Sequence, residues 1–147
     1  MTPEPPSSLD DAVTRAVSCA AKLKLEAPSA LFLLATGAER FADGLDQPRQ
    51  VPLEDLEGVP GCWSGLDLFA ARVNDSVIWC IEDAPAYTRT SSDPAWTRAF
   101  PVWWAAACGA EALIHSSAGT FLQGEASGLA YLTDHVNLSG STPLDRK

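Results

Sequence analysis

Positive charge is scarce in this chain, which has 10 Lys and Arg residues against 19 Asp and Glu residues and a formal net charge of -9. Nucleic-acid binding takes its non-specific affinity from clustered Lys and Arg side chains that displace counterions. We therefore expect no nucleic-acid partner. The acidic side chains form a solvated surface that keeps the chain soluble, and their charge alone names no substrate.

Long apolar runs are also absent, so no segment is expected to cross a bilayer and no membrane partner is predicted. The acidic, Pro-rich start lacks the basic and then apolar order of a secretion signal. The cysteines lie far apart and form no CxxC pair, which excludes a zinc ribbon and a thioredoxin-like motif: Cys19, Cys62, Cys80 and Cys108. We expect buried, reduced thiols in a cytoplasmic protein.

Histidine is limited to His115 and His135, which stand beside Ser116 and Asp134. A Ser-His-Asp hydrolase on an α/β sheet would need a Gly-x-Ser-x-Gly elbow, and the sequence has none. A metal site would need a third ligand at helical or loop spacing. We therefore expect structural histidines, no catalytic residue, no metal and no cofactor.

The 147 residues, with 46% hydrophobic content, are enough for one compact domain with a core and too few for two. Residues 1–8 are Pro-rich and are predicted to form a flexible lead. Residues 9–147 are predicted to form a single domain. There are no internal repeats and no low-complexity tract.

The first predicted elements are a helix and a strand. Ser7 or Ser8 can cap a helix that ends before Pro28. Its apolar residues recur at spacings of three and four: Leu9, Ala12, Val13, Ala16, Val17, Ala20 and Leu23. The continuous apolar run 30–35 then predicts a strand buried on both faces.

The runs 66–73 and 76–81, joined by Asn74-Asp75, predict a hairpin. A second helix is expected over 93–109, with Asp93 as its N-cap and a kink at Pro101. Its tryptophans pack in the core or face a partner: Trp96, Trp103 and Trp104. Buried strands are expected at 112–115 and 129–133. The order predicts an α/β fold with a mixed, largely parallel sheet and flanking helices.

In open α/β sheets, ligands bind beyond the carboxyl ends of the strands. These exits are 36–38, 82–87, 116–119 and 134–137. Small residues and hydroxyls at two of them would let backbone N–H groups approach an anion, as in loops that cradle phosphate.

Several fragments in sequence order resemble the trimeric class of purine nucleoside phosphorylases. Leu34-Ala35-Thr36-Gly37 and Phe41 to Leu45 resemble the family's phosphate loop, and Val59-Pro60-Gly61 resembles its Val-Pro-Gly-His segment. Ser116 to Gly119 stands where the family has Asn-Ala-Ala-Gly-Gly. The most specific fragment is 134–140, Asp-His-Val-Asn-Leu-Ser-Gly, which nearly matches the family's Asp-His-Ile-Asn-Leu-x-Gly.

The resemblance implies phosphorolysis, in which inorganic phosphate as co-substrate attacks the anomeric carbon of a purine nucleoside. It assigns Thr36 and Ser116 to vestigial phosphate binding and Tyr87 to the ribose. Ser117 and Ala118 would back the purine. The fold implied is the N-terminal half of the nucleoside phosphorylase domain, with a purine nucleoside and phosphate as the only ligands.

The sequence also departs from the family pattern at the phosphate cradle. Asp83 and Pro85 stand where the family has an arginine and a histidine, and Cys62 replaces the histidine after Val-Pro-Gly. A carboxylate repels an anion, and proline offers no donor. The base-binding glutamate and asparagine belong to a C-terminal half that this sequence does not contain, so we expect a truncated site with little activity alone.

Three readings stay open at this stage. The chain is a weak or inactive phosphorylase, a non-catalytic assembly or regulatory subunit, or one half of a split enzyme. If a sheet that carries helices on both faces is cut in half, strand edges and one face of the sheet become exposed. We therefore expect a partner that covers them. Self-association into a dimer or trimer is the first expectation, and a separate C-terminal half is the second.

Overall fold

The computed structural model describes residues 5–35, 40–84 and 93–116. Within them one sheet has the strand order β2-β3-β4-β1-β5. Its strands are β1 (Ala30–Leu33), β2 (Arg49–Pro52), β3 (Asp67–Val73), β4 (Ser76–Ile81) and β5 (Ala112–His115). Strands β4, β1 and β5 are parallel, whereas β2, β3 and β4 pair antiparallel. This confirms the predicted mixed α/β fold.

Helix α1 (Leu9–Lys22) begins as its sequence predicts, with Ser8 as the N-cap. The Ser8 hydroxyl accepts a hydrogen bond from the Asp11 N–H at 3.3 Å, which satisfies one of the free amides of the first turn. The predicted apolar stripe faces inward, since Ala12, Ala16 and Ala20 are buried. These small side chains let α1 pack closely against its neighbours.

Helix α2 (Trp96–Ala107) begins later than predicted, and the expected Asp93 cap is wrong. Its N-cap residue is Ala95, which has helical dihedral angles and no capping side chain. The hydrogen bonds at the start of the helix come from Thr97 instead. Its N–H and its hydroxyl both donate to the Pro94 carbonyl, at 3.0 and 2.8 Å. Pro101 lies inside the helix, and the kink expected there stays a prediction.

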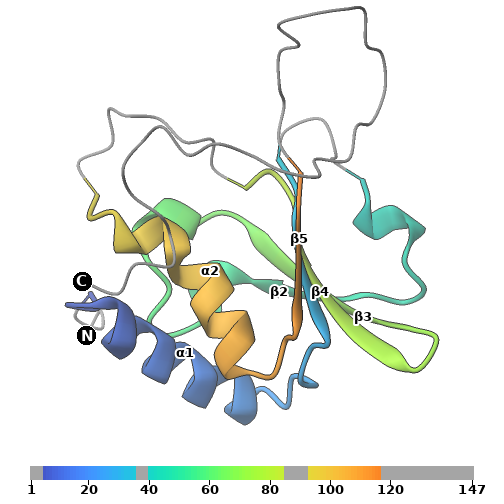
Figure 1. Ribbon diagram of the computed structural model, residues 1–147, viewed down its shortest axis with the longest axis horizontal. Helices are drawn as coiled ribbons and strands as arrows, with labels where there is room; N and C mark the ends of the chain where they lie inside the picture. Colours follow the sequence, from blue (N-terminus) through green and yellow to red (C-terminus); the bar gives the residue numbers. More distant parts are fainter. Residues whose placement is uncertain (1–4, 36–39, 85–92, 117–147) are drawn as a thin grey trace, which may run out of the picture.

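Both helices lie side by side on one face of the sheet, where the main core forms (Figure 1). Trp104 of α2 is fully buried there. Its ring lies 4.7 Å from that of Trp79 in β4 and 5.8 Å from that of Phe100, measured between centroids. Core packing is therefore confirmed for Trp104, while Trp96 and Trp103 are only half-buried.

The predicted hairpin is confirmed as β3 and β4, and its turn residue Asn74 has a φ of +53°. Strand β2 was not predicted. It is short, and its sequence Arg-Gln-Val-Pro contains one buried side chain, Val51. Such a strand carries almost no hydrophobic pattern, so only its pairing with β3 reveals it.

The expectation of full burial is wrong for β5 and holds only in part for β1. In β1 only Leu31 and Leu33 are buried, on the helix face. All four residues of β5 are exposed, because β5 is the outermost described strand and both helices lie toward the other strands. A run of apolar residues predicts a strand but does not give its position in the sheet.

Three short 3₁₀ helices complete the described part of the chain: η1 (Ala42–Gly44), η2 (Leu53–Asp55) and η3 (Gly61–Trp63). The first follows β1, and the other two lie between β2 and β3. No described helix is long and apolar enough to cross a membrane.

Candidate functional site

The carboxyl ends of β1, β4 and β5 meet at one edge of the sheet, as the parallel arrangement requires. Past the strand ends, the Ala84 N–H donates to the Leu34 carbonyl at 2.9 Å. On the other side of β1, the Ser116 N–H donates to the Leu33 carbonyl at 3.0 Å. The described residues that lead into three of the four predicted strand exits are therefore adjacent.

Ser116 is the one predicted binding residue among the described ones. It is half-buried, and its hydroxyl accepts a hydrogen bond from the Ala35 N–H at 3.1 Å. This bond places Ser116 beside the residue that precedes Thr36 in the chain. It also occupies a backbone donor at the end of β1 that an anion could otherwise use.

Glu82, the first residue after β4, bonds to the segment that follows β1. One carboxylate oxygen accepts from the Ala42 N–H at 2.6 Å, and the other accepts from the Arg40 N–H at 3.3 Å. These amides stand at the start of η1, where a phosphate-binding loop would present donors to its ligand. Here these amides donate to the carboxylate of Glu82, a contact that no local sequence pattern indicates.

The charged groups at this edge are mostly acidic. Exposed Arg40 forms an ion pair with Asp43 at 2.8 Å, and Asp83 is exposed with a φ of +53°. Asp43, Glu82 and Asp83 with Arg40 give these described residues a formal charge of -2. This field opposes the approach of an anion.

The remaining predicted site residues lie outside the described ranges: Thr36, Tyr87, Ser117 and Ala118. So do Pro85 and the motif at 134–140. Their assignments stay predictions.

The structure also describes two residues at which the sequence departs from the phosphorylase motifs, Cys62 and His115. Cys62 lies in η3, half-buried, with its Sγ 4.0 Å from the Thr97 carbonyl oxygen. Burial raises the pKa of this thiol, which keeps it protonated. His115 ends β5 and is exposed. No group of three or more potential metal ligands occurs among the described residues, and all four cysteines are free thiols.

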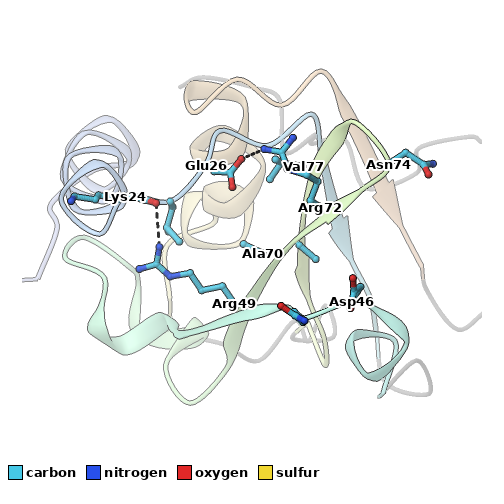
Figure 2. A pocket seen from close by; sticks show the side chains of 11 residues that line it. Lys24, Glu26, Asp46, Arg49, Ala70, Arg72, Asn74 and Val77 are labelled. Carbon is cyan, nitrogen blue, oxygen red and sulfur yellow. Dashed lines mark hydrogen bonds and ion pairs between the residues drawn. The ribbon is translucent and has the colours of Figure 1, made fainter.

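A groove of about 440 Å³ lies at the opposite ends of the strands, between the end of α1 and the sheet. Figure 2 shows that the guanidinium groups of Arg49 and Arg72 bond to the segment after α1. The Arg49 guanidinium donates to the Leu23 and Lys24 carbonyls at 2.7 and 3.1 Å, and Arg72 bonds to Glu26. The guanidinium groups therefore hold the last turn of α1 and the following loop on the sheet.

No protein-family model matches this sequence, and no curated protein is detectably similar to it. Solved structures, however, share its fold. A Schistosoma mansoni purine nucleoside phosphorylase in complex with acetate superposes with a TM-score of 0.62 at 16% identity, over 74% of this chain and 40% of that one. The Schistosoma mansoni enzyme in complex with adenosine superposes with a TM-score of 0.59 at 16% identity. That superposition covers 70% of this chain and 36% of the enzyme.

A purine nucleoside phosphorylase with ribose-1-phosphate superposes with a TM-score of 0.63 at 15% identity, over 76% of this chain and 41% of that one. This chain therefore spans about 40% of the length of the phosphorylases that it resembles. At such low identity the superposition establishes the fold alone. The described part of the chain has the fold of part of a purine nucleoside phosphorylase.

Proposed function

We propose that this chain is a purine nucleoside phosphorylase-like protein whose isolated form cleaves purine nucleosides weakly or not at all. The family reaction, phosphate-dependent cleavage to a free base and ribose 1-phosphate, would be placed at the carboxyl ends of β1, β4 and β5. The fold supports the family relation. The contacts of Glu82 support the loss of turnover, and this is the observation on which the proposal rests.

The physical reason lies in what phosphorolysis needs. A phosphate nucleophile must be held by donors and positive charge while the sugar becomes cationic. Here the amides of Arg40 and Ala42 bond to Glu82, and the amide of Ala35 bonds to Ser116. Removing one such donor from an enzyme typically lowers the rate about 10² to 10³-fold. Losing several would leave little measurable activity.

Phosphorolysis by the purified chain is the direct test. Incubation with inosine or guanosine and millimolar phosphate is expected to release no hypoxanthine or guanine above a protein-free blank. An active phosphorylase of known fold serves as the positive control. Base release proportional to the concentration of this protein would contradict the proposal.

A measurement of phosphate binding shows whether inactivity comes from a lost phosphate site or from a slow chemical step. A ligand present at 100 times its dissociation constant stabilises the folded state by about 2.7 kcal/mol. We expect the thermal midpoint in millimolar phosphate to equal that in sodium chloride of the same ionic strength. A clear rise in phosphate alone would show that the cradle still works.

One half of a split enzyme is a second candidate. The base-binding residues would then come from a separate polypeptide. Adding a C-terminal phosphorylase half to the assay distinguishes the two candidates. Restored turnover supports the split enzyme, and continued inactivity supports a non-catalytic subunit.

A further inference from the structure

Pro101 interrupts the hydrogen bonding of α2 at one defined carbonyl. It lies in the second turn of the helix, whereas proline is well tolerated only in the first. In an α-helix the N–H of each residue donates to the carbonyl four positions earlier. Since Pro101 has no N–H, the Thr97 carbonyl lacks its helical donor. The first turn of α2 is therefore joined to the rest of the helix by one hydrogen bond fewer than in a regular helix.

Trp63 of η3 supplies the missing donor. Its indole N–H donates to the Thr97 carbonyl oxygen at 2.7 Å. The contact is dry, since Trp63 and Thr97 are only 4% and 6% exposed. The Cys62 thiol, 4.0 Å from the same oxygen, is a weak second donor. Because a buried carbonyl needs a partner, Trp63 satisfies a group that the proline would otherwise leave unpaired.

The two parts of α2 consequently have different anchors. The first turn is bonded to η3 through Thr97. Beyond Pro101, Trp104 is fully buried and packs on Trp79 of β4, with 4.7 Å between the ring centroids. A proline that removes a bond between two separately anchored parts of a helix is a point at which the helix can bend.

We infer that α2 is hinged at Pro101 and that the hydrogen bond from Trp63 to Thr97 is the latch that holds its first turn against η3. When the latch opens, the first turn leaves η3 while the rest of the helix stays on the sheet. The chain that leaves β4 enters α2 through this turn, so the turn that moves is the one joined to the predicted strand exit at 82–87. The inference does not depend on the proposed function, since local opening and turnover are measured separately.

Amide hydrogen exchange of the full chain, resolved residue by residue by NMR, tests the hinge, because exchange from the folded state reports local opening. Trp63→Phe removes the donor and keeps an aromatic ring in the core. The amides of 97–100 are then expected to exchange about tenfold faster, since the Thr97 carbonyl is left unpaired. The amides of 105–108, at the other end of α2, are the internal control and are expected to change much less. Circular dichroism checks that the variant folds.

Pro101→Ala tests whether the proline is the reason for the latch. This substitution gives the Thr97 carbonyl a helical donor, so the amides of 97–100 are expected to exchange more slowly than in the wild type. In the Pro101→Ala background, Trp63→Phe no longer leaves that carbonyl unpaired. Its effect on the exchange rates is expected to fall to about twofold or less. The four proteins form a double-mutant cycle.

Thiol labelling gives a second readout at the two ends of the same helix. Cys62 lies against the first turn of α2, Cys108 is the C-cap residue, and both are half-buried. An open latch uncovers Cys62 alone. Trp63→Phe is therefore expected to raise the rate at which iodoacetamide labels Cys62 about tenfold and to leave that of Cys108 unchanged, as peptide mass spectrometry measures. In the double variant with Pro101→Ala, the rate for Cys62 is expected to return toward the wild-type value.

Three results would overturn the inference. The first is an equal acceleration of exchange at 97–100 and at 105–108 in Trp63→Phe, which would indicate a general loss of stability. The second is an effect of Trp63→Phe that is the same with and without Pro101, since the carbonyl would then not depend on the indole. The third is unchanged exchange at 97–100 in Pro101→Ala, which decides against the hinge even where Trp63→Phe does not fold.

Discussion

At the scale of single residues, Glu82 links two segments that lie forty residues apart in the chain. Its carboxylate accepts hydrogen bonds from the amides of Arg40 and Ala42 and so fixes the start of η1 against the end of β4. Phe41, between those amides, stacks on Phe32 of β1. Glu82 therefore also holds the segment that carries Phe41 against β1.

Glu82→Ala is expected to lower the free energy of unfolding by about 1–3 kcal/mol, because two backbone donors lose their acceptor. Glu82→Gln keeps one acceptor oxygen and is expected to lose less. Urea denaturation of the three proteins measures the difference. Equal stability of the wild type and the alanine variant would show that water replaces the carboxylate without cost.

Cys80 gives a pH-dependent prediction. Burial raises the pKa of this thiol from 9.0 to about 12, with a smaller contribution from the negative charge of Glu82. In the unfolded chain the thiol ionises near pH 9. Below that pH the thiol is neutral in both states, so its contribution to the free energy of unfolding is fully present. It is lost as the pH rises toward 12.

The comparison with Cys80→Ala isolates this effect, since all other titrating groups are shared. The stability advantage of the wild type over Cys80→Ala is expected to be constant between pH 7 and 8. It should then narrow steadily above pH 9. Urea denaturation at each pH measures it. A constant difference up to the highest pH at which both proteins fold would contradict the raised pKa.

At the scale of elements, the close approach of α1 to the segment after η2 depends on Gly58. This residue has a φ of +93°, and a Cβ there would lie 2.5 Å from the Ala12 carbonyl oxygen and 2.7 Å from the Arg15 Cβ. Two independent costs therefore oppose any side chain at this position. One is the left-handed backbone conformation, and the other is a collision with helix backbone.

Gly65 supplies the matched control, because it has a φ of +83° with no atom within 4 Å of an added Cβ. Gly65→Ala is expected to cost about 1–2 kcal/mol from the backbone conformation alone. Gly58→Ala is expected to cost about 1–3 kcal/mol more, from displacement of α1. Denaturant midpoints measure both variants. Equal losses would show that α1 moves aside freely.

At the scale of the whole molecule, both described helices lie on the same face of the sheet (Figure 1). Both described helices contribute to the core that contains Trp79 and Leu31, while Ile114 and Phe41 are exposed. Phosphorylases that share this fold are nearly twice as long, since the superposed three quarters of this chain covers about 40% of them.

The sequence by itself determined the elements whose signals are local. A serine cap at Ser7 or Ser8, the alanine stripe of α1, the hairpin around Asn74 and a mixed, largely parallel sheet follow from capping, periodicity, turn chemistry and chain order. It also indicated where a site would lie, because the carboxyl ends of parallel strands share one edge.

Only the tertiary structure decided what depends on neighbours that are distant in sequence. The apolar runs of β4 and β5 look alike, yet one is central and buried and the other is an exposed edge, because burial depends on position in the sheet. Strand β2 is recognised only by its hydrogen-bonded pairing with β3. Glu82 reads as a surface carboxylate until folding brings the amides of Arg40 and Ala42 to it. Such contacts join residues forty positions apart, beyond the reach of any local pattern.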